Sequence, residues 1–225
     1  MGPLPAIAIV PVKRFSEAKQ RLSDALAPRQ REQLATAMLG DVLAAIRQAE
    51  LIERVLIISR EPRLVGVAAT HEATLVDDPG DMSHSSAAAI GIATALACRA
   101  GSIALLAGDC PLLDPVELDG ALADLERGVV GVIPDRHGSG TNGLLCCPPN
   151  LIEPAFGPGS RERHLELAAK AGGRGKIFAL DSLALDLDTG GDLEELRGVV
   201  GAGRLAGSAT AGALKAIEGR EAGAQ

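Results

Sequence analysis

Two short stretches of the chain carry carboxylates that could bind a divalent cation. Asp109 follows an apolar run in LLAGDCPLLDP, residues 105–115. An acid just past a buried strand lies at the carboxyl edge of a parallel sheet, where open α/β folds bind their ligands. Asp186 and Asp188 alternate in LALDLDTGGDLEEL, residues 183–196, so on a strand they would share a face. Carboxylates suit Mg²⁺ beside phosphates, and one of this pair could meet Asp109 across the cation.

Both acidic stretches also have a structural interpretation. Asp109 could begin a turn whose geometry is set by Pro111. Asp188 and Thr189 could form a turn, and Asp192 is expected to cap the N-terminus of the helix that follows.

Basic side chains gather after the first apolar run, in VPVKRFSEAKQRL, residues 10–22. Lys13, Lys19 and Arg21, together with Arg14, suit the phosphates of a nucleoside triphosphate. A solvated basic surface is the alternative. The segment matches neither a G-x-x-x-x-G-K-[ST] loop nor a G-x-G-x-x-G fingerprint.

The stretch PDRHGSGTNGLL, residues 134–145, is a polar loop between two apolar runs. Gly138 and Gly140 would let the backbone approach a ligand closely, and Thr141 and Asn142 could supply hydrogen bonds. We interpret the loop as one wall of an anion pocket.

The second wall is predicted in AFGPGSRERH, residues 155–164. Its turn from Gly157 to Ser160 places backbone N–H groups and a hydroxyl at the entry of a helix, with Arg161 and Arg163 close by. Taken alone, such a run indicates only a loop.

Composition excludes several other classes of function. The chain has 22 basic and 29 acidic residues and no long basic run, which argues against nucleic-acid binding. The four histidines lack metal-ligand spacing, and no G-x-S-x-G motif is present. The four cysteines lack C-x-x-C spacing and are expected to be buried, small hydrophobic residues. The N-terminal apolar run is too short for a signal peptide or a membrane span, so we expect a cytoplasmic protein.

Aliphatic runs alternate with helical patterns, which predicts an α/β three-layer sandwich. The two apolar runs on either side of the polar loop leave no room for a helix and indicate a hairpin whose loop projects from the sheet edge. One domain over residues 1–200 is expected, and the Gly/Ala-rich tail, 201–225, is interpreted as a short helix or a mobile end. Strands are predicted at 6–12, 54–59, 74–78, 102–108, 128–134, 143–149 and 176–189, and helices at 28–51, 85–100 and 114–126.

Taken in order, these motifs resemble the guanylyltransferases that act on small phosphorylated acids in coenzyme F420 biosynthesis. The matching text is VPVKRFSEAKQRLS, AMLGDVLAAI, GDCPLL, PDRHGSGTNGLL, FGPGSRERH and LDLDTGGDL, spanning roughly residues 7–197. The resemblance implies a Rossmann-like fold of the nucleotide-diphospho-sugar transferase type. It also implies an enzyme that joins GMP from GTP to phosphoenolpyruvate, 2-phospho-L-lactate or 3-phospho-D-glycerate and releases pyrophosphate.

The resemblance further implies roles for individual residues. Mg²⁺ would be the cofactor, GTP the co-substrate, and a homodimer is a further expectation. An acceptor phosphate is already an anionic nucleophile, so no general base is needed. The implied residues are Thr141, Gly157 and Ser160 for the acceptor, with Asn142, Arg136 and His137 as further candidates; Asp109 and Asp188 for the metal, with Asp186 as a third candidate; Lys13, Lys19 and Arg21 for the triphosphate; and Pro11, Val12, Lys13, Ser85 and Ser86 for the nucleotide.

One segment, GDMSHSSAAAIGIATAL at 80–96, departs from the Leu-Asn-x-Ala-Leu stretch of many family members. Met82, His84 and Ser86 are therefore candidates for an altered choice of base or acceptor, although Ser85 or Ser86 could simply cap a helix. The alternatives to this function are a nucleotidyltransferase with another acceptor or base, and a non-catalytic nucleotide-binding protein.

Overall fold

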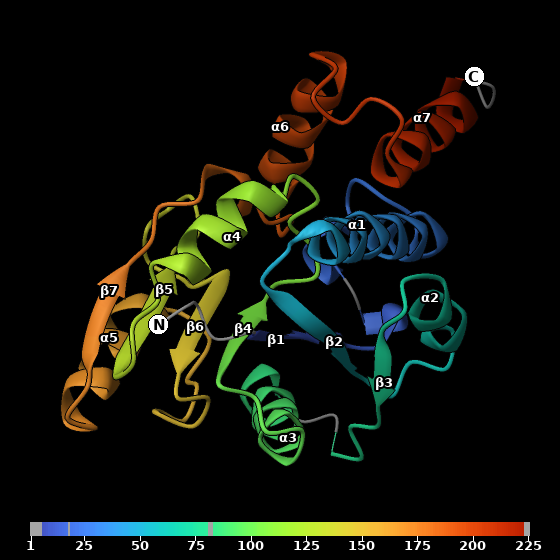
Figure 1. Cartoon of the computed structure of the whole chain (residues 1–225). Helices are drawn as coiled ribbons and strands as arrows, with labels where there is room; N and C mark the ends of the chain where they lie inside the picture. Colours follow the sequence, from blue (N-terminus) through green and yellow to red (C-terminus); the bar gives the residue numbers. More distant parts are fainter. Residues whose placement is uncertain (1–5, 18, 81–82, 223–225) are drawn as a thin grey trace.

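The computed structural model describes residues 6–17, 19–80 and 83–222. Its centre is a seven-stranded sheet in the order β3-β2-β1-β4-β6-β5-β7 (Figure 1). All neighbouring strands run parallel except β6, which is antiparallel to both β4 and β5. The strands are β1 (Ala6–Pro11), β2 (Ile52–Ile58), β3 (Thr74–Val76), β4 (Ser102–Leu106), β5 (Val129–Ile133), β6 (Gly143–Cys147) and β7 (Arg174–Ile177).

Strand β1 shows why the central strands are apolar throughout. Ile7 and Ile9 belong to one buried cluster, whereas Ala8 and Val10 belong to another on the opposite face of the sheet. Successive side chains of a strand point to opposite faces, so a strand covered on both sides must be apolar at every position. This explains the continuous runs in the sequence.

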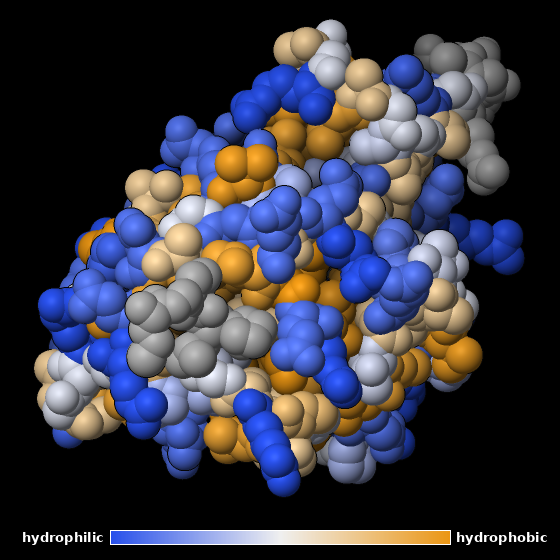
Figure 2. Space-filling view, in the orientation of Figure 1, coloured by the Kyte–Doolittle hydropathy of each residue, from blue (hydrophilic) through white to orange (hydrophobic). Residues whose placement is uncertain are grey.

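Helices cover both faces of the sheet and confirm the three-layer arrangement. Helices α1 (Pro28–Gln48), α2 (Leu64–Thr70) and α4 (Pro115–Ala123) contribute to the core on one face. Helices α3 (His84–Ala97) and α5 (Ser160–Lys170) contribute to the core on the other face. Figure 1 shows these two layers with the sheet between them. Hydrophilic side chains are spread over the face seen in Figure 2, with apolar ones in smaller groups among them.

The C-terminal segment packs on the outer side of α1. Helices α6 (Gly190–Gly201) and α7 (Ala209–Ala222) share a third apolar cluster with α1 that includes Leu34, Leu193 and Leu214. Asp41 on α1 accepts hydrogen bonds from the first two N–H groups of α7, at 2.9 and 2.8 Å, and so satisfies donors that a helix N-terminus leaves unpaired. Of the two interpretations of the tail, the structure shows the helix.

The strand predicted over 176–189 is wrong beyond Ile177. The Phe178 N–H donates to Val132 O at 2.9 Å, and the chain then leaves the sheet and forms a short 3₁₀ turn at Asp181–Leu183. Beyond it, Ala184 O accepts from the Arg136 N–H at 2.9 Å, so these backbone groups find partners in a loop and not in a strand.

Three smaller predictions also need correction. The β5–β6 hairpin is present, but it lies inside the sheet, so its loop projects from the carboxyl end of β5 and not from a lateral edge. Helix α2 was not predicted from the sequence, and helices α1, α3 and α4 each end three residues earlier than predicted. Cys110, Cys146 and Cys147 are buried as expected, whereas Cys98 is exposed.

Candidate functional site

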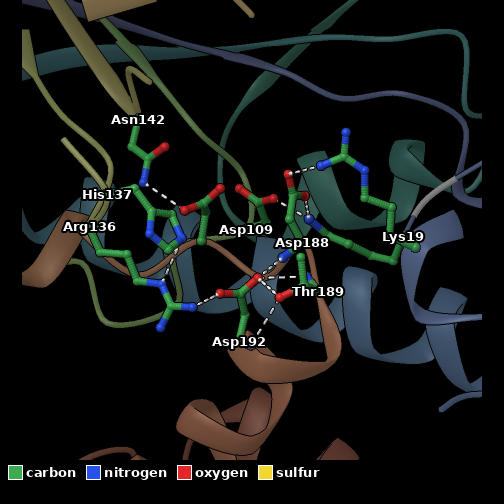
Figure 3. A network of polar contacts seen from close by, with 10 residues as sticks. Lys19, Asp109, Arg136, His137, Asn142, Asp188, Thr189 and Asp192 are labelled. Atoms are coloured by element: carbon green, nitrogen blue, oxygen red, sulfur yellow. Dashed lines mark hydrogen bonds and ion pairs between the residues drawn. The ribbon is translucent and has the colours of Figure 1, made fainter. Parts of the chain in front are cut away.

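The charged candidates converge on the carboxyl ends of β1, β4 and β5 (Figure 3). Lys19 follows β1 and Asp109 follows β4, and the Lys19 ammonium forms an ion pair with the Asp109 carboxylate. The same ammonium lies 3.3 Å from Asp188 Oδ1. Arg21 is more peripheral, with its guanidinium 3.8 Å from Asp188 Oδ2 and its side chain 76% exposed.

Lys19 is held as a buried cation. Burial by itself lowers the pKa of an ammonium, but attraction and hydrogen bonding to Asp109 and Asp188 outweigh this and raise the pKa of Lys19. Its backbone is left-handed, with φ at 55°, which is uncommon for a residue with a side chain. The fold therefore keeps a permanent positive charge between two carboxylates.

Asp186 completes a group of three neighbouring acids. Its Oδ1 accepts from Asn142 Nδ2 at 3.2 Å, and the same amide donates to Leu183 O at 3.0 Å and to Ala184 O at 3.2 Å. Burial, followed by the charges of Asp109 and Asp188, raises the pKa of Asp186. Asp186 is therefore close enough to Asp109 and Asp188 to feel their charges, and it is placed by a loop anchored by Asn142 and not by alternation along a strand.

Asp192 fastens this loop to the start of α6. The N-cap of α6 is Thr189, not Asp192 as predicted, and Asp192 occupies position N3 of the capping box. Its Oδ2 accepts from the backbone N–H of Asp188 at 3.0 Å and from the Thr189 hydroxyl at 2.8 Å. These hydrogen bonds and the Arg136 charge outweigh burial and lower the pKa of Asp192.

Arg136 and His137 lie beside this capping box. The Arg136 guanidinium forms an ion pair with Asp192, and its Nε lies 3.3 Å from His137 Nε2 (Figure 3). The same guanidinium also forms an ion pair with Glu195. Arg136 therefore connects the 134–145 loop to α6, which is a structural role beside the acceptor-binding role expected for it.

The conformation of the 134–145 loop itself accounts for two of its glycines. Gly138 has φ at 70°, a conformation that side chains disfavour. A Cβ on Gly140 would lie 2.5 Å from Asp135 Oδ2. The loop thus folds over the Asp135 side chain, whose Oδ1 accepts from the Ser139 N–H at 3.0 Å.

The two predicted walls of the anion pocket do meet. Ser160 Oγ donates to Thr141 Oγ1 at 3.0 Å, and Thr141 Oγ1 lies 3.2 Å from Nδ1 of the buried His164. Gly157 precedes this helix entry with φ at 111°. Thr141 opens on a pocket of about 210 Å³, lined by Pro11, His84, Leu105, Leu106, Ala107, Thr141, Asn142 and Phe156.

A second pocket adjoins the first at Pro11 and His84. It measures about 240 Å³ and is lined by Pro11, Val12, Lys13, Asp78, Ser83, His84 and Ala87. Burial lowers the pKa of His84. The charge of Asp109 acts in the opposite direction, and the charges of Lys13 and Lys19 lower the pKa further. The pockets and the Lys19 ion pairs thus lie at one edge of the sheet, where its parallel strands have their carboxyl ends.

The serines at the start of α3 have mainly structural partners. Ser83 caps the helix and accepts from the Ser86 N–H at 3.0 Å, while Ser86 Oγ in turn accepts from the Ser83 N–H at 3.0 Å. Ser85 Oγ accepts from the Phe156 N–H at 3.1 Å. Ser86 thus takes part in helix capping, but as the N3 residue of a capping box whose N-cap is Ser83. Met82 lies outside the described residues.

Glu61 and His164 are functional candidates that sequence reasoning did not single out. Glu61 is buried after β2 and accepts from the Phe15 N–H at 3.0 Å, which ties down the segment between Lys13 and Lys19. The position of His164, four residues after Ser160 and one helical turn along α5, is the only signal that could have found it.

The fold matches that of known nucleotidyltransferases. A protein of Desulfovibrio desulfuricans G20, described as a nucleotide-diphospho-sugar transferase, superimposes with a TM-score of 0.77 at 14% identity and with 96% of each chain covered. This confirms the predicted fold class, which the chain shares with proteins described as nucleotidyl and cytidylyl transferases.

Comparison of the sequence with protein families identifies a narrower group than the fold does. Residues 6–206 match the family described as "Guanylyl transferase CofC like". A phosphoenolpyruvate guanylyltransferase of Conexibacter woesei is 42% identical, with 93% of this chain and 95% of that protein covered. One of Sphaerobacter thermophilus is 37% identical, with 85% and 92% covered. The chain belongs to the CofC-like guanylyl transferase family, which confirms the resemblance noted in its sequence.

Among the described residues, no helix combines the length and hydropathy needed to span a bilayer. Within the same residues, no three His, Cys, Asp or Glu side chains form a ready-made metal site.

Proposed function

We propose that the chain transfers GMP from GTP to phosphoenolpyruvate, as the names of its relatives in Conexibacter and Sphaerobacter indicate for those proteins. The observation that carries the proposal is that the ion pairs of Lys19 with Asp109 and Asp188, and the hydrogen-bonded hydroxyls of Thr141 and Ser160, lie at the same edge of the sheet. An acidic pair that could bind a cation, together with a small pocket lined by a threonine hydroxyl, suits a reaction between a triphosphate and a phosphorylated acid.

The acceptor fits the pocket at Thr141. The anionic oxygens of a phosphorylated three-carbon acid would accept from the Thr141 hydroxyl, whose oxygen is already hydrogen-bonded by the Ser160 hydroxyl, and from backbone N–H groups near Gly157. The apolar part of the wall, including Phe156 and Leu105, would contact its carbon atoms. 2-Phospho-L-lactate and 3-phospho-D-glycerate have the same charges and are the alternative acceptors.

The nucleotide fits the adjoining pocket at Pro11, Val12 and Lys13. From there the phosphates would extend toward Lys19, whose ammonium lies between the acids. Lys13, Lys19 and Arg21 would then offset charge on the triphosphate.

The acidic pair fits Mg²⁺. The Lys19 ammonium already lies between Asp109 and Asp188, so the pair accommodates a cation. Magnesium is commonly bound through one or two carboxylates together with substrate phosphates, so a ready-made cage is not required. When bound, it would neutralise phosphate charge, with Asp186 as a further oxygen donor.

The reaction needs no general base. A phosphate oxygen of the acceptor attacks the α-phosphorus of GTP, the bond from that phosphorus to the bridging oxygen breaks, and pyrophosphate leaves with the electron pair. The nucleophile is already an anion, so no proton has to be removed. The protein would contribute alignment of the two substrates and neutralisation of their charges.

Pyrophosphate release tests the proposal. The protein is incubated with Mg²⁺ and GTP and with each of the three acceptors in turn, and CTP replaces GTP as the control. We expect release with GTP and phosphoenolpyruvate and much less with CTP. Absence of release with every acceptor would exclude the proposal.

A further inference from the structure

We propose that His164 is a positioning residue that directs the hydroxyl proton of Thr141 into the acceptor pocket. This inference rests on the function proposed above and assigns a role to a side chain that does not itself line the pocket. The inference depends on which groups around His164 and Thr141 can donate a hydrogen bond and which can only accept one.

The first step concerns the imidazole. The His164 side chain is fully buried, and its Nε2 lies 3.0 Å from the backbone nitrogen of Ala155. A backbone N–H can only donate, so Nε2 must carry a lone pair and not a proton. Burial, with the charge of Arg163, lowers the pKa of His164 to about 4, so the ring is neutral near pH 7. The single ring proton is then on Nδ1.

The second step concerns the threonine hydroxyl. With its proton on Nδ1, the His164 ring donates to Thr141 Oγ1 at 3.2 Å. Ser160 Oγ also donates to Thr141 Oγ1, at 3.0 Å. Two donors occupy the two lone pairs of this oxygen, so the Thr141 O–H must itself donate elsewhere. The remaining direction is the pocket that Thr141 lines.

The ring has little freedom to turn. Phe156 packs edge-on against His164, with ring centroids 5.2 Å apart and an interplanar angle of 74°. His84 packs on Phe156 in the same way at 5.6 Å and 77°. Rotation of the His164 ring would break its hydrogen bond with the Ala155 N–H, so the orientation of the Nδ1 donor is set before substrate arrives.

A hydroxyl held as a donor suits an anion. Phosphate and carboxylate oxygens only accept hydrogen bonds, and a preoriented donor loses no rotational freedom when one binds. Without the Nδ1 proton, Thr141 could turn its own proton away from the pocket and toward the vacated ring position. Acceptor binding would weaken, while binding of GTP in the adjoining pocket would not change.

Two substitutions separate positioning from packing. His164→Asn keeps an amide nitrogen near the place of Nδ1, whereas His164→Gln extends toward the place of Nε2 and leaves Thr141 without its donor. We expect His164→Gln to raise the KM for phosphoenolpyruvate about tenfold, with the KM for GTP and kcat nearly unchanged. His164→Asn should restore most of that loss. Equal losses in both variants, or an equal rise in the KM for GTP, would overturn the proposal.

A Thr141→Val background supplies the matched control. There the hydroxyl is absent, so His164→Gln should no longer change the KM for the acceptor. A further tenfold rise in that background would show that His164 acts by another route.

The protonation of the two His164 ring nitrogens can be measured directly in the wild-type protein, independently of the variants. Nitrogen-15 NMR of the His164 imidazole at pH 7 should show a protonated Nδ1 and a bare Nε2. A protonated Nε2, or a doubly protonated ring, would refute the proposal even if turnover is normal. If wild-type protein shows the expected ring but turns over no acceptor, the proposed function fails while the hydrogen-bond assignment remains.

Discussion

Replacing Glu61 by Gln tests how the segment that carries the lysines is held. The Glu61 carboxylate accepts only from donors: the Phe15 N–H at 3.0 Å, and the Arg63 backbone N–H and guanidinium at 2.7 to 3.2 Å. A Gln side chain would turn an NH₂ group toward some of these donors, so at least one buried N–H would lose its partner. The substitution therefore acts on hydrogen bonds and charge with little change in volume.

The pKa of Glu61 gives the size of the effect. Hydrogen bonds from Arg63, opposed by burial and supported by the Phe15 N–H, lower the pKa of Glu61 from 4.5 to about 2. A shift of that size corresponds to about 3 kcal/mol of stability at neutral pH. Because the Arg63 side chain is 51% exposed, we reduce this to about 2 kcal/mol. For a chain of this length that is a fall in Tm of about 4 to 8 °C.

The sign of the pH dependence follows from the depressed pKa. The folded state binds the Glu61 proton more weakly than the unfolded chain does, so this stabilisation is complete above pH 4.5 and declines as the pH falls toward 2. Urea unfolding of wild type and Glu61→Gln should therefore differ by about 2 kcal/mol at pH 7 and by about half of that or less at pH 3. Glu53→Gln, at an exposed site on β2, is the control and should cost less than about 0.5 kcal/mol. A Glu61→Gln deficit that is equal at both pH values, or no larger than that of the control, would refute the reasoning.

Two further predictions concern the acidic site. Asp109→Asn should lower the rate of pyrophosphate release by about 100-fold or more, because it removes a charge from the acidic pair proposed to bind the cation; activity within tenfold of wild type would contradict the assignment. Asn142→Ala removes the amide that holds Leu183 O, Ala184 O and Asp186, and should cost about 2 kcal/mol in urea unfolding as well as activity. An Asn142→Ala protein of wild-type stability would show that other contacts hold this loop.

The sheet could be predicted from the sequence because its strands are buried on both faces. A strand such as β1 or β4 is apolar at every position, and that pattern is visible without any knowledge of its neighbours. The segment after β7 misled the prediction because Leu183, Leu185 and Leu187 alternate with smaller or acidic residues as in a strand. Their side chains are buried, but their backbone is held by the amide and N–H groups of a distant loop.

The sequence could predict which charged residues gather at one edge of the sheet, but not which partners they contact. Residues that follow strands in a parallel sheet meet at one edge, which is why Lys19 and Asp109 were candidates, whereas Thr141 was a candidate because of the polar loop that carries it. Nothing local to Lys19 indicates that it pairs with acids 90 and 169 positions away. His164 was missed for a similar reason, since its ring matters only through Thr141 and Ala155, which other segments bring to it.

Phosphorus-31 NMR of a complete reaction tests the central claim most directly. The wild-type protein is mixed with Mg²⁺, GTP and phosphoenolpyruvate, and the signals are followed with time. The account predicts that the GTP and phosphoenolpyruvate signals fall together while those of pyrophosphate and a diphosphate diester rise in equal amounts. Formation of GDP and inorganic phosphate instead, or unchanged substrates at high enzyme concentration, would contradict it.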